Sequence, residues 1–126
     1  MGWKFQTDRP IYAQLVEQVK QKIITGVYPP GSKMPSVREL AAEASVNPNT
    51  MQRAFSQLEQ EGLLYTQRTS GRFVTEDQGR ITAMKEELAR ELIRSFLENM
   101  EQLGYTSSQA QELIAKSRKE GASHEN

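Results

Sequence analysis

The sequence predicts a mainly helical protein with one small β-hairpin, ending in a short two-helix module. Apolar residues recur at helical spacing in several stretches, and two strong helix starts, at Ser36 and Asn47, lie on either side of a tight turn. Two β-prone runs around Gly71 follow the helix that starts at Asn47. Helix, short helix, tight turn, helix and hairpin within about 65 residues define an N-terminal winged helix-turn-helix.

The first helix is expected from about Pro10 to Thr25. Proline suits a first helical turn because its missing N–H leaves no bond unmade there. Gly26 ends the helix, and the Pro29-Pro30-Gly31 segment cannot continue it. One helical face carries the apolar side chains Tyr12, Leu15, Val16, Val19 and Ile23.

The second helix opens at Ser36, where Glu39, three residues on, completes a capping box. Its expected buried residues are Leu40, Ala41 and Ala44. After a tight turn at 45–46, Asn47 caps a third helix that carries Pro48 at its first position and runs to about Glu61. The spacing of this third helix predicts a buried stripe of Met51, Ala54, Phe55 and Leu58.

The short runs 63–68 and 72–75 flank a Gly-containing turn and predict a hairpin. Helical patterning returns from Asp77 to about Leu103, and the capping box 106–109 opens a last helix that reaches about Lys119. Residues 121–126 are expected to fray. We therefore expect a winged helix-turn-helix DNA-binding domain at 1–75 and a helical dimerisation module at 76–126.

Charge is divided unevenly although the 126-residue chain has 16 basic and 16 acidic residues. Residues 1–75 carry nine Lys or Arg against six acids, whereas residues 76–126 carry seven against ten. A basic N-terminal part and an acidic C-terminal part indicate two modules with different partners. A difference of this size also fits chance.

The composition argues against catalysis and against metal binding. The chain has no cysteine, and its single histidine, His124, lies beside the end of the sequence. Catalysis would therefore need a carboxylate pair, yet the acids lie on predicted helix surfaces. We predict no catalytic residue, cofactor or metal, and hence no enzyme. The sequence also has no apolar run near the roughly 18 residues of a membrane span and no signal-peptide core, so we expect a cytoplasmic protein without membrane contact.

The outer side of the third helix carries the residues best suited to reading DNA. Asn49, Gln52, Arg53 and Ser56 lie opposite the buried stripe and can all hydrogen-bond base edges. No Asp or Glu occurs between Asn47 and Leu58, whereas a solvated helix face usually mixes both signs. This pattern favours a recognition helix over an ordinary polar surface, which is the alternative.

Other residues are placed to contact phosphates or the minor groove. Asn47 and Thr50 lie in the first helical turn, where outward N–H groups attract anions, and Arg38 is placed to contact the DNA backbone. Arg68 and Arg72 flank a small hairpin tip that can enter a minor groove, unless the turn is merely soluble. The full predicted DNA-binding set is Lys33, Ser36, Arg38, Asn47, Asn49, Thr50, Gln52, Arg53, Ser56, Arg68, Ser70, Gly71 and Arg72.

Several spaced motifs within residues 10–75 resemble the GntR family of bacterial transcription regulators. They are PIYxQL at 10–15, GxYxPGSKMPSxRELA at 26–41, VNPNT at 46–50, LExEGL at 58–63 and GxFV at 71–74. The resemblance implies a winged helix that binds operator DNA as a dimer, with Arg38 and Thr50 at the family's DNA-contacting positions. Many members carry Ser/Thr-Arg where this chain has Asn47-Pro48, and an arginine where it has Gln52. The NPNTxQR version resembles the YtrA subfamily and implies a repressor of a transporter operon.

The C-terminal module resembles the YtrA type in having only about 50 residues, which form two predicted helices. Apolar positions cover more of its first helix than one surface stripe requires, and the last helix offers few residues to cover them. A second copy of the chain is the simplest cover, although the winged domain of the same chain is the alternative. The predicted dimerisation residues are Ile81, Met84, Leu88, Leu92, Phe96, Met100 and Leu103.

The sequence therefore predicts a homodimeric, sequence-specific DNA-binding regulator, with double-stranded pseudo-palindromic operator DNA as its partner. A further hypothesis is that a small-molecule effector of unknown identity binds near Phe96 and Met100. The alternative function is a winged-helix module that binds proteins and not DNA, which would need no acid-free helix face.

Overall fold

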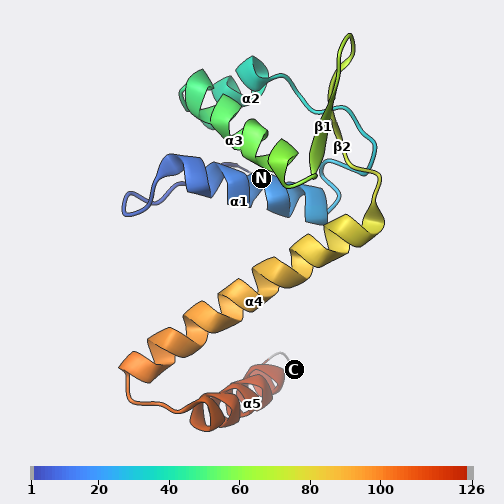
Figure 1. The fold of residues 1–126 in the computed structure, drawn as a ribbon. Coiled ribbons are helices and arrows are strands. Elements are labelled where there is room, and N and C mark those ends of the chain that lie inside the picture. The colour runs from blue at the N-terminus through green and yellow to red at the C-terminus, as the bar shows by residue number, and fades with distance from the viewer. Residues whose placement is uncertain (1, 125–126) are drawn as a thin grey trace. The chain divides into compact units, whose positions relative to one another are not determined.

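The computed structural model describes residues 2–124, with side chains through residue 120 (Figure 1). Its elements are α1 (Ile11–Ile24), α2 (Val37–Ala44), α3 (Pro48–Gln60), β1 (Leu64–Gln67), β2 (Gly71–Val74), α4 (Gln78–Gln102) and α5 (Ser107–His124). These elements confirm the mainly helical fold with one hairpin. Contacts divide the chain into two compact units, Met1–Lys85 and Glu86–Asn126, so α4 begins in the first unit and ends in the second.

The predicted caps of α2 and α3 are confirmed. The Ser36 hydroxyl accepts from the Glu39 N–H at 3.1 Å, and the Glu39 carboxylate accepts from the Ser36 N–H at 3.3 Å. Between the two helices, Ser45 adopts the left-handed conformation with φ of 58°. Asn47 caps α3 by accepting the Asn49 N–H at 2.7 Å. Each helix start is thus fixed by side chains within three residues of it.

The core of the first unit forms between α1, α2 and α3. The predicted α3 stripe is fully buried, with no exposed surface on Met51, Ala54, Phe55 or Leu58. The predicted faces of α1 and α2 are also buried, except that Tyr12 is half-buried. Residues outside the predicted faces complete the core from the loop before α2 and from the hairpin: Met34, Leu63, Leu64 and Val74.

The hairpin, called the wing from here on, comprises β1, β2 and the turn between them. The strands are antiparallel, with Leu64 opposite Val74 and Gln67 opposite Gly71. The segment before α2 adds a bridge from Lys33 to Phe73, so the wing is also paired along its second edge. The wing is therefore attached to the start of α2 as well as to the end of α3.

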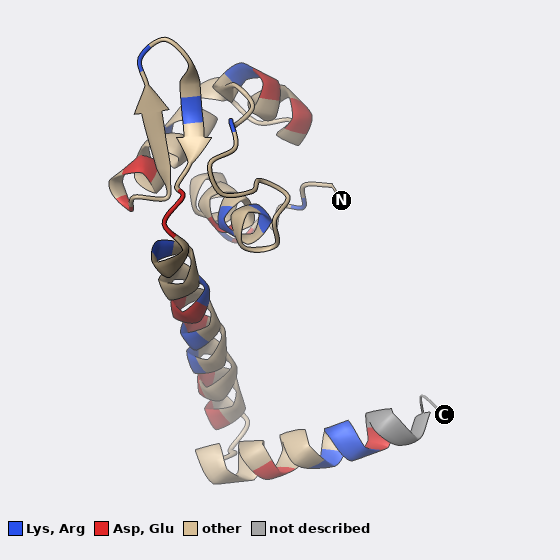
Figure 2. Ribbon diagram, turned by 90° about the vertical axis from the view of Figure 1, so that its right-hand side faces the viewer, with Lys and Arg blue, Asp and Glu red and all other residues tan. Residues whose placement is uncertain are grey.

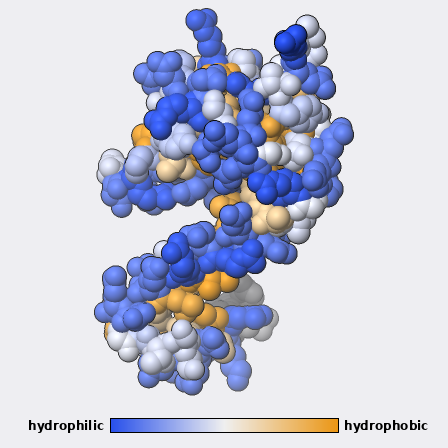
Figure 3. All heavy atoms as spheres, in the orientation of Figure 1, coloured by the Kyte–Doolittle hydropathy of each residue, from blue (hydrophilic) through white to orange (hydrophobic). Residues whose placement is uncertain are grey.

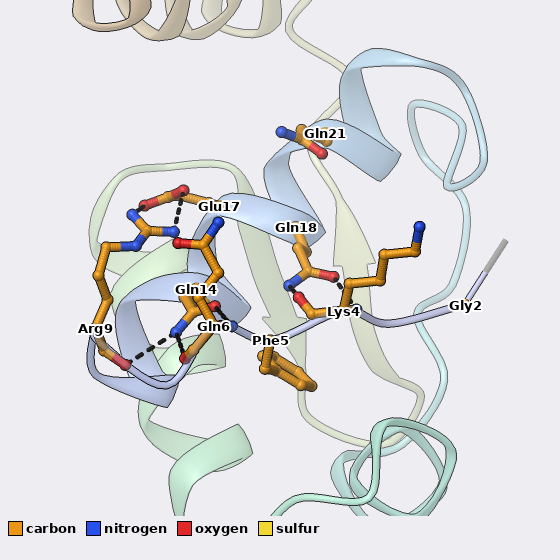
Figure 4. A pocket seen from close by; sticks show the side chains of 9 residues that line it. All are labelled: Gly2, Lys4, Phe5, Gln6, Arg9, Gln14, Glu17, Gln18 and Gln21. Carbon is orange, nitrogen blue, oxygen red and sulfur yellow. Dashed lines mark hydrogen bonds and ion pairs between the residues drawn. The ribbon is translucent and has the colours of Figure 1, made fainter. Parts of the chain in front are cut away.

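One polar residue of α1 is buried, which helical patterning did not predict. Gln14 is 2% exposed, and its Nε2 donates to the carbonyl oxygens of Gln6 and Arg9, each at 2.9 Å. Its Oε1 accepts the Gln6 N–H at 2.7 Å. One turn later, Gln18 exchanges two bonds with the backbone of Lys4 (Figure 4). These amides hold the segment before α1 along the helix.

An ion pair joins α1 to the end of α3. Lys20 Nζ lies 2.7 Å from Glu61 Oε1, and Gln57 Nε2 donates to Glu61 Oε2 at 2.9 Å. Burial raises the pKa of Glu61, but the hydrogen bonds from Lys20 and Gln57 and the charges of Lys20 and Arg80 more than offset it. The pKa of Glu61 is therefore held below its ordinary value.

The start of α4 belongs to the first unit, which corrects two of the predicted dimerisation residues. Ile81 and Met84 are 8% and 3% exposed, so they are buried within their own chain. Arg80 Nε also donates to the carbonyl oxygen of Glu61 at 2.6 Å. For these first turns of α4, the alternative of burial within the same chain is correct. Helical spacing identifies an apolar face but not what covers it.

The second unit contains the rest of α4 together with α5. The predicted capping box at the start of α5 is confirmed, since Thr106 Oγ1 accepts the Gln109 N–H at 3.1 Å and Gln109 Oε1 accepts the Thr106 N–H at 2.9 Å. Ala110 is the one fully buried residue of α5 among its described side chains. α5 continues to His124, past the end predicted near Lys119, because a glycine inside a helix lowers its stability by only about 1 kcal/mol. Residues 125 and 126 of the predicted frayed tail lie outside the described residues.

None of the described helices combines the length and the apolar character that crossing a bilayer requires.

Replacing Gln14 with Ala should lower the free energy of unfolding by about 1–3 kcal/mol, because two backbone carbonyls and one N–H lose their partner. Urea titration measures this change. Gln18→Ala is the matched control, since its bonds to Lys4 are exposed, and it should cost less. Equal losses in the two variants would contradict a structural role specific to Gln14.

Replacing Glu61 with Gln should lower the free energy of unfolding by about 1 kcal/mol at pH 7. The folded-state pKa of Glu61 is lowered, so its stabilisation is fully present above the unfolded pKa, which is about 4.3. The stabilisation is lost as the pH falls through the folded value, and the wild type and the variant should therefore converge in acid. Urea titrations from pH 7 downward measure this, and a difference that stays constant would contradict it.

Candidate DNA-binding surface

The outer face of α3 consists of Asn49, Gln52, Arg53 and Ser56, and all four residues are exposed. They lie opposite the buried stripe, as the helical period predicts. Gln52 Nε2 donates to Ser56 Oγ at 3.3 Å, so these two side chains are aligned along the helix. The face therefore presents amide, hydroxyl and guanidinium groups and no carboxylate.

Arg53 is held by a residue that sequence patterning assigned only to the α1 core. Its guanidinium carbon lies 4.4 Å from the centroid of the Tyr12 ring. The Tyr12 hydroxyl donates in turn to Gln57 Oε1 at 3.2 Å. The half-burial of Tyr12 follows, since one side of its ring faces Arg53 while the rest packs at the α1–α3 contact.

The first turn of α3 differs from the anion site that the sequence predicts. Pro48 has no N–H, and the Asn49 N–H is bound by the Asn47 side chain. The Thr50 N–H donates to the Asn47 carbonyl oxygen at 3.0 Å. The backbone donors of this turn are thus satisfied within the chain, and the Asn47 oxygen is occupied by capping. What remains for an anion is the helix dipole and the half-buried Thr50 hydroxyl.

Arg38 lies in the first turn of α2 and is exposed. Among the side chains that the structure describes, none forms an ion pair with it, so its positive charge is not neutralised. Ser36, just before it, accepts the capping bond but keeps its hydroxyl hydrogen to donate.

A cleft of about 500 Å³ lies between the start of α2 and the wing. Its lining includes Lys33, Ser36, Thr66, Arg68, Ser70 and Arg72, which come from both sides. Gly71 has φ of 112°, and a Cβ there would lie 3.1 Å from Lys33 Cε, so glycine lets the lysine lie across the wing. Six predicted DNA-binding residues thus line one cleft although they come from separate segments: Lys33, Ser36, Arg68, Ser70, Gly71 and Arg72.

The two wing arginines have different surroundings. Arg68 is exposed in the turn at the tip, where Ser70 N–H donates to the Gln67 carbonyl oxygen. Figure 2 shows basic but no acidic residues on the wing. The tip therefore carries an exposed positive charge that is suited to a narrow, negative groove.

Arg72, by contrast, does not belong to the tip. It lies in β2, where its Nε donates to Glu59 of α3, and its guanidinium lies 5.3 Å from the Phe55 ring. Glu59 also accepts from the Thr66 hydroxyl at 3.0 Å. Arg72 therefore differs from Arg68, because its charge is paired with Glu59 and it attaches the wing to α3. No sequence signal identifies Glu59 as its partner.

The second unit carries most of the exposed large apolar residues. Leu92 and Leu103 are 71% and 73% exposed, Phe96 is 39% exposed, and Leu88 and Met100 are half-buried. A groove of about 390 Å³ between α4 and α5 is lined by Phe96, Met100, Ala110, Leu113 and Ile114, among others. Apolar atoms gather in the lower part of Figure 3, where this unit lies. Large side chains that a folded chain normally buries are thus left uncovered.

Among the side chains that the structure describes, in residues 2–120, no three His, Cys, Asp or Glu residues lie close enough together to hold a metal ion.

Comparison with known proteins identifies relatives of this fold. A family described as "Bacterial regulatory proteins, gntR family" matches residues 11–74. The chain is 38% identical over 114 residues to the HTH-type transcriptional regulator YhcF of Bacillus subtilis, over 90% of this chain and 94% of that protein. It is also 38% identical to the HTH-type transcriptional repressor YtrA of Bacillus subtilis, over 70% of this chain and 72% of that protein.

Solved structures agree with these relatives. A GntR family transcriptional regulator from Listeria monocytogenes has a TM-score of 0.81 and 39% identity, over 91% of this chain and 98% of that one. AraR(DBD) in complex with operator ORX1 has a TM-score of 0.53 and 32% identity, over 57% of this chain and 93% of that one. The fold, the matched motifs and the long alignments agree, and the chain belongs to the GntR family of bacterial regulatory proteins, which are DNA-binding transcription regulators and not enzymes.

Proposed function

We propose that this chain is a homodimeric repressor that binds a specific pseudo-palindromic operator. The proposal is carried by the exposed, acid-free outer face of α3, together with two further exposed arginines, Arg38 and Arg68. Phosphates repel carboxylates, so a helix that enters a DNA groove is expected to lack them where it meets the DNA. A protein-binding winged helix has no such requirement.

The roles follow from side-chain chemistry. Asn49 and Gln52 would read adenine, and Arg53 would read guanine, in the major groove. Arg38 would contact a phosphate, with Lys33, Ser36 and the Thr50 hydroxyl as further backbone contacts. Arg68, with Ser70 and Gly71 at the tip, would enter a minor groove.

The second unit would supply the dimer. Leu88, Leu92, Phe96, Met100 and Leu103 provide apolar area that a second copy can cover. Burial of one leucine is worth on the order of 1.5–3 kcal/mol, so a few such side chains from each chain can sustain association. A twofold pair reads half-sites about 10 base pairs apart, which gives the pseudo-palindrome.

Repression is supported by the relatives, since YtrA and NagR of Bacillus subtilis are both named transcriptional repressors. Control of a transporter operon is proposed from the resemblance to the YtrA subfamily. The groove between α4 and α5 would be the place for a small apolar effector. A regulator that binds genomic operators in bacteria acts in the cytoplasm.

The proposal is tested by selecting duplexes from a random library with the purified full-length chain and titrating the selected site. The selected site should bind at least about 1000-fold more tightly than a shuffled duplex at physiological salt. Equal affinity for the two duplexes would reject sequence-specific regulation.

Replacing Arg38 with Ala should weaken binding to all duplexes alike and should reduce the salt slope by about one, because one phosphate contact is lost. Replacing Arg53 with Ala should instead reduce discrimination at one base pair of each half-site. Titrations at several salt concentrations separate the two effects. Arg90→Ala, which removes an exposed arginine from α4, is the control for loss of one charge. If both test variants bind as the wild type does, this surface is not the DNA-binding surface.

Replacing Leu92 with Glu should weaken self-association by about 100-fold or more, because each dimer would lose two buried leucines and gain two buried charges. Analytical ultracentrifugation measures the dimer dissociation constant. Val27→Glu, at a position 49% exposed in the first unit, is the matched control and should leave association unchanged. A fully dimeric Leu92→Glu variant would contradict this interface.

A further inference from the structure

Arg53 differs from the ion-paired basic residues of the first unit in how its charge is accommodated. Arg9, Lys20 and Arg72 each form an ion pair with a glutamate. In the described part of the chain no carboxylate pairs with Arg53, whose guanidinium lies over the Tyr12 ring at 4.4 Å. Its charge is therefore held in place by an aromatic face and is not neutralised.

The Tyr12 ring is itself held at its far end. The hydroxyl donates to Gln57 Oε1 at 3.2 Å, and Gln57 Nε2 donates to Glu61 at 2.9 Å. Glu61 is paired with Lys20 of α1. These linked contacts restrict the Tyr12 ring, so the ring does not rotate freely and can support the Arg53 side chain.

The position of Arg53 on α3 determines where this support matters. At about 100° per residue, Arg53 is turned by roughly 200° from Met51, which lies in the buried stripe. Asn49 shares this outermost side. Arg53 is thus at the part of α3 that would approach base edges most closely, and it leans toward α1, where Tyr12 lies.

Stacking suits an arginine that must read a base. A ring beneath the flat guanidinium occupies its face, whereas its N–H groups lie in the plane and remain free at the edge. Guanine O6 and N7 are recognised by two such N–H groups in that plane. Ordering the side chain before binding also removes part of the entropy loss that association would otherwise require.

We propose that Tyr12 is a positioning residue that sets operator specificity by holding Arg53 in the orientation that reads guanine. This inference rests on the proposed function and assigns a specificity role to a residue of α1, outside the helix-turn-helix. Tyr12 would act through Arg53 and would touch no base itself. The Tyr12 ring would contact the Arg53 guanidinium, and the Tyr12 hydroxyl would keep the ring in place through Gln57.

The test measures dissociation constants of the full-length chain for the selected operator and for operators changed at one base pair at a time. Arg53→Ala identifies the pair that Arg53 reads, since discrimination disappears there. Tyr12→Leu should reduce discrimination at the same pair by about tenfold, from loss of the cation–π contact and of side-chain ordering. Tyr12→Phe keeps the ring and should retain discrimination within about twofold.

The controls separate positioning from general structure. Ile11→Ala changes the exposed neighbour of Tyr12 and should leave all discrimination unchanged. A purely structural effect of Tyr12→Leu would weaken binding to every duplex by one factor and would overturn the inference, as would no effect at all. In the Arg53→Ala background, Tyr12→Leu should have no further effect on discrimination, and a further loss would also overturn it.

The inference and the proposed function fail in different ways. If Arg53→Ala leaves discrimination intact at every base pair while the wild type remains specific, the inference is wrong and the proposed function stands. If the wild type does not distinguish its selected operator from a shuffled duplex, the proposed function is wrong and the inference falls with it.

Discussion

Burial of one face of α3 is the constraint on which the arrangement of the first unit depends. Met51, Ala54, Phe55 and Leu58 have no exposed surface, so α3 cannot rotate about its axis without exposing them. The other side of the helix is thereby fixed toward solvent, and its residues are presented in a defined order. The short turn at Ser45 and the Asn47 cap add a second constraint, because they leave little freedom between α2 and α3.

Side chains from neighbouring elements hold some of the residues of the candidate DNA-binding surface in place. Glu59 holds Arg72 and Thr66, and so attaches the wing to α3. Tyr12 holds Arg53 from the α1 side. Side chains that are already held in place lose less conformational entropy when a partner binds, which favours selectivity. Arginines without an ion-pair partner instead contribute long-range electrostatic attraction. Counting basic residues alone would therefore overstate the free positive charge, because Arg72 is already neutralised.

The second unit presents a different physical problem. Its two helices bury Ala110 but leave Leu92 and Leu103 largely exposed. Exposing an apolar face of this kind to water is unfavourable, so burying it against another apolar surface is stabilising. A second copy is the proposed cover, and association would place two recognition helices on one DNA molecule. Dimerisation and DNA reading would then be linked, since a monomer would contact only a half-site.

Local sequence determined most of the secondary structure. The caps at Ser36, Asn47 and Thr106 act over two or three residues, so the residues that decide them are adjacent in the chain. The buried stripe of α3 and its outer face followed from the helical period alone.

Tertiary structure decided which polar groups meet and which apolar groups are covered. Gln14 is buried because backbone carbonyls of the preceding segment turn back to it, and Ile81 is covered while Leu92 is not, although both fit one helical pattern. The pairs Arg72–Glu59 and Arg53–Tyr12 join residues from different elements. Such contacts depend on how elements pack in three dimensions, and the periodicity of a single element carries no information about its neighbours.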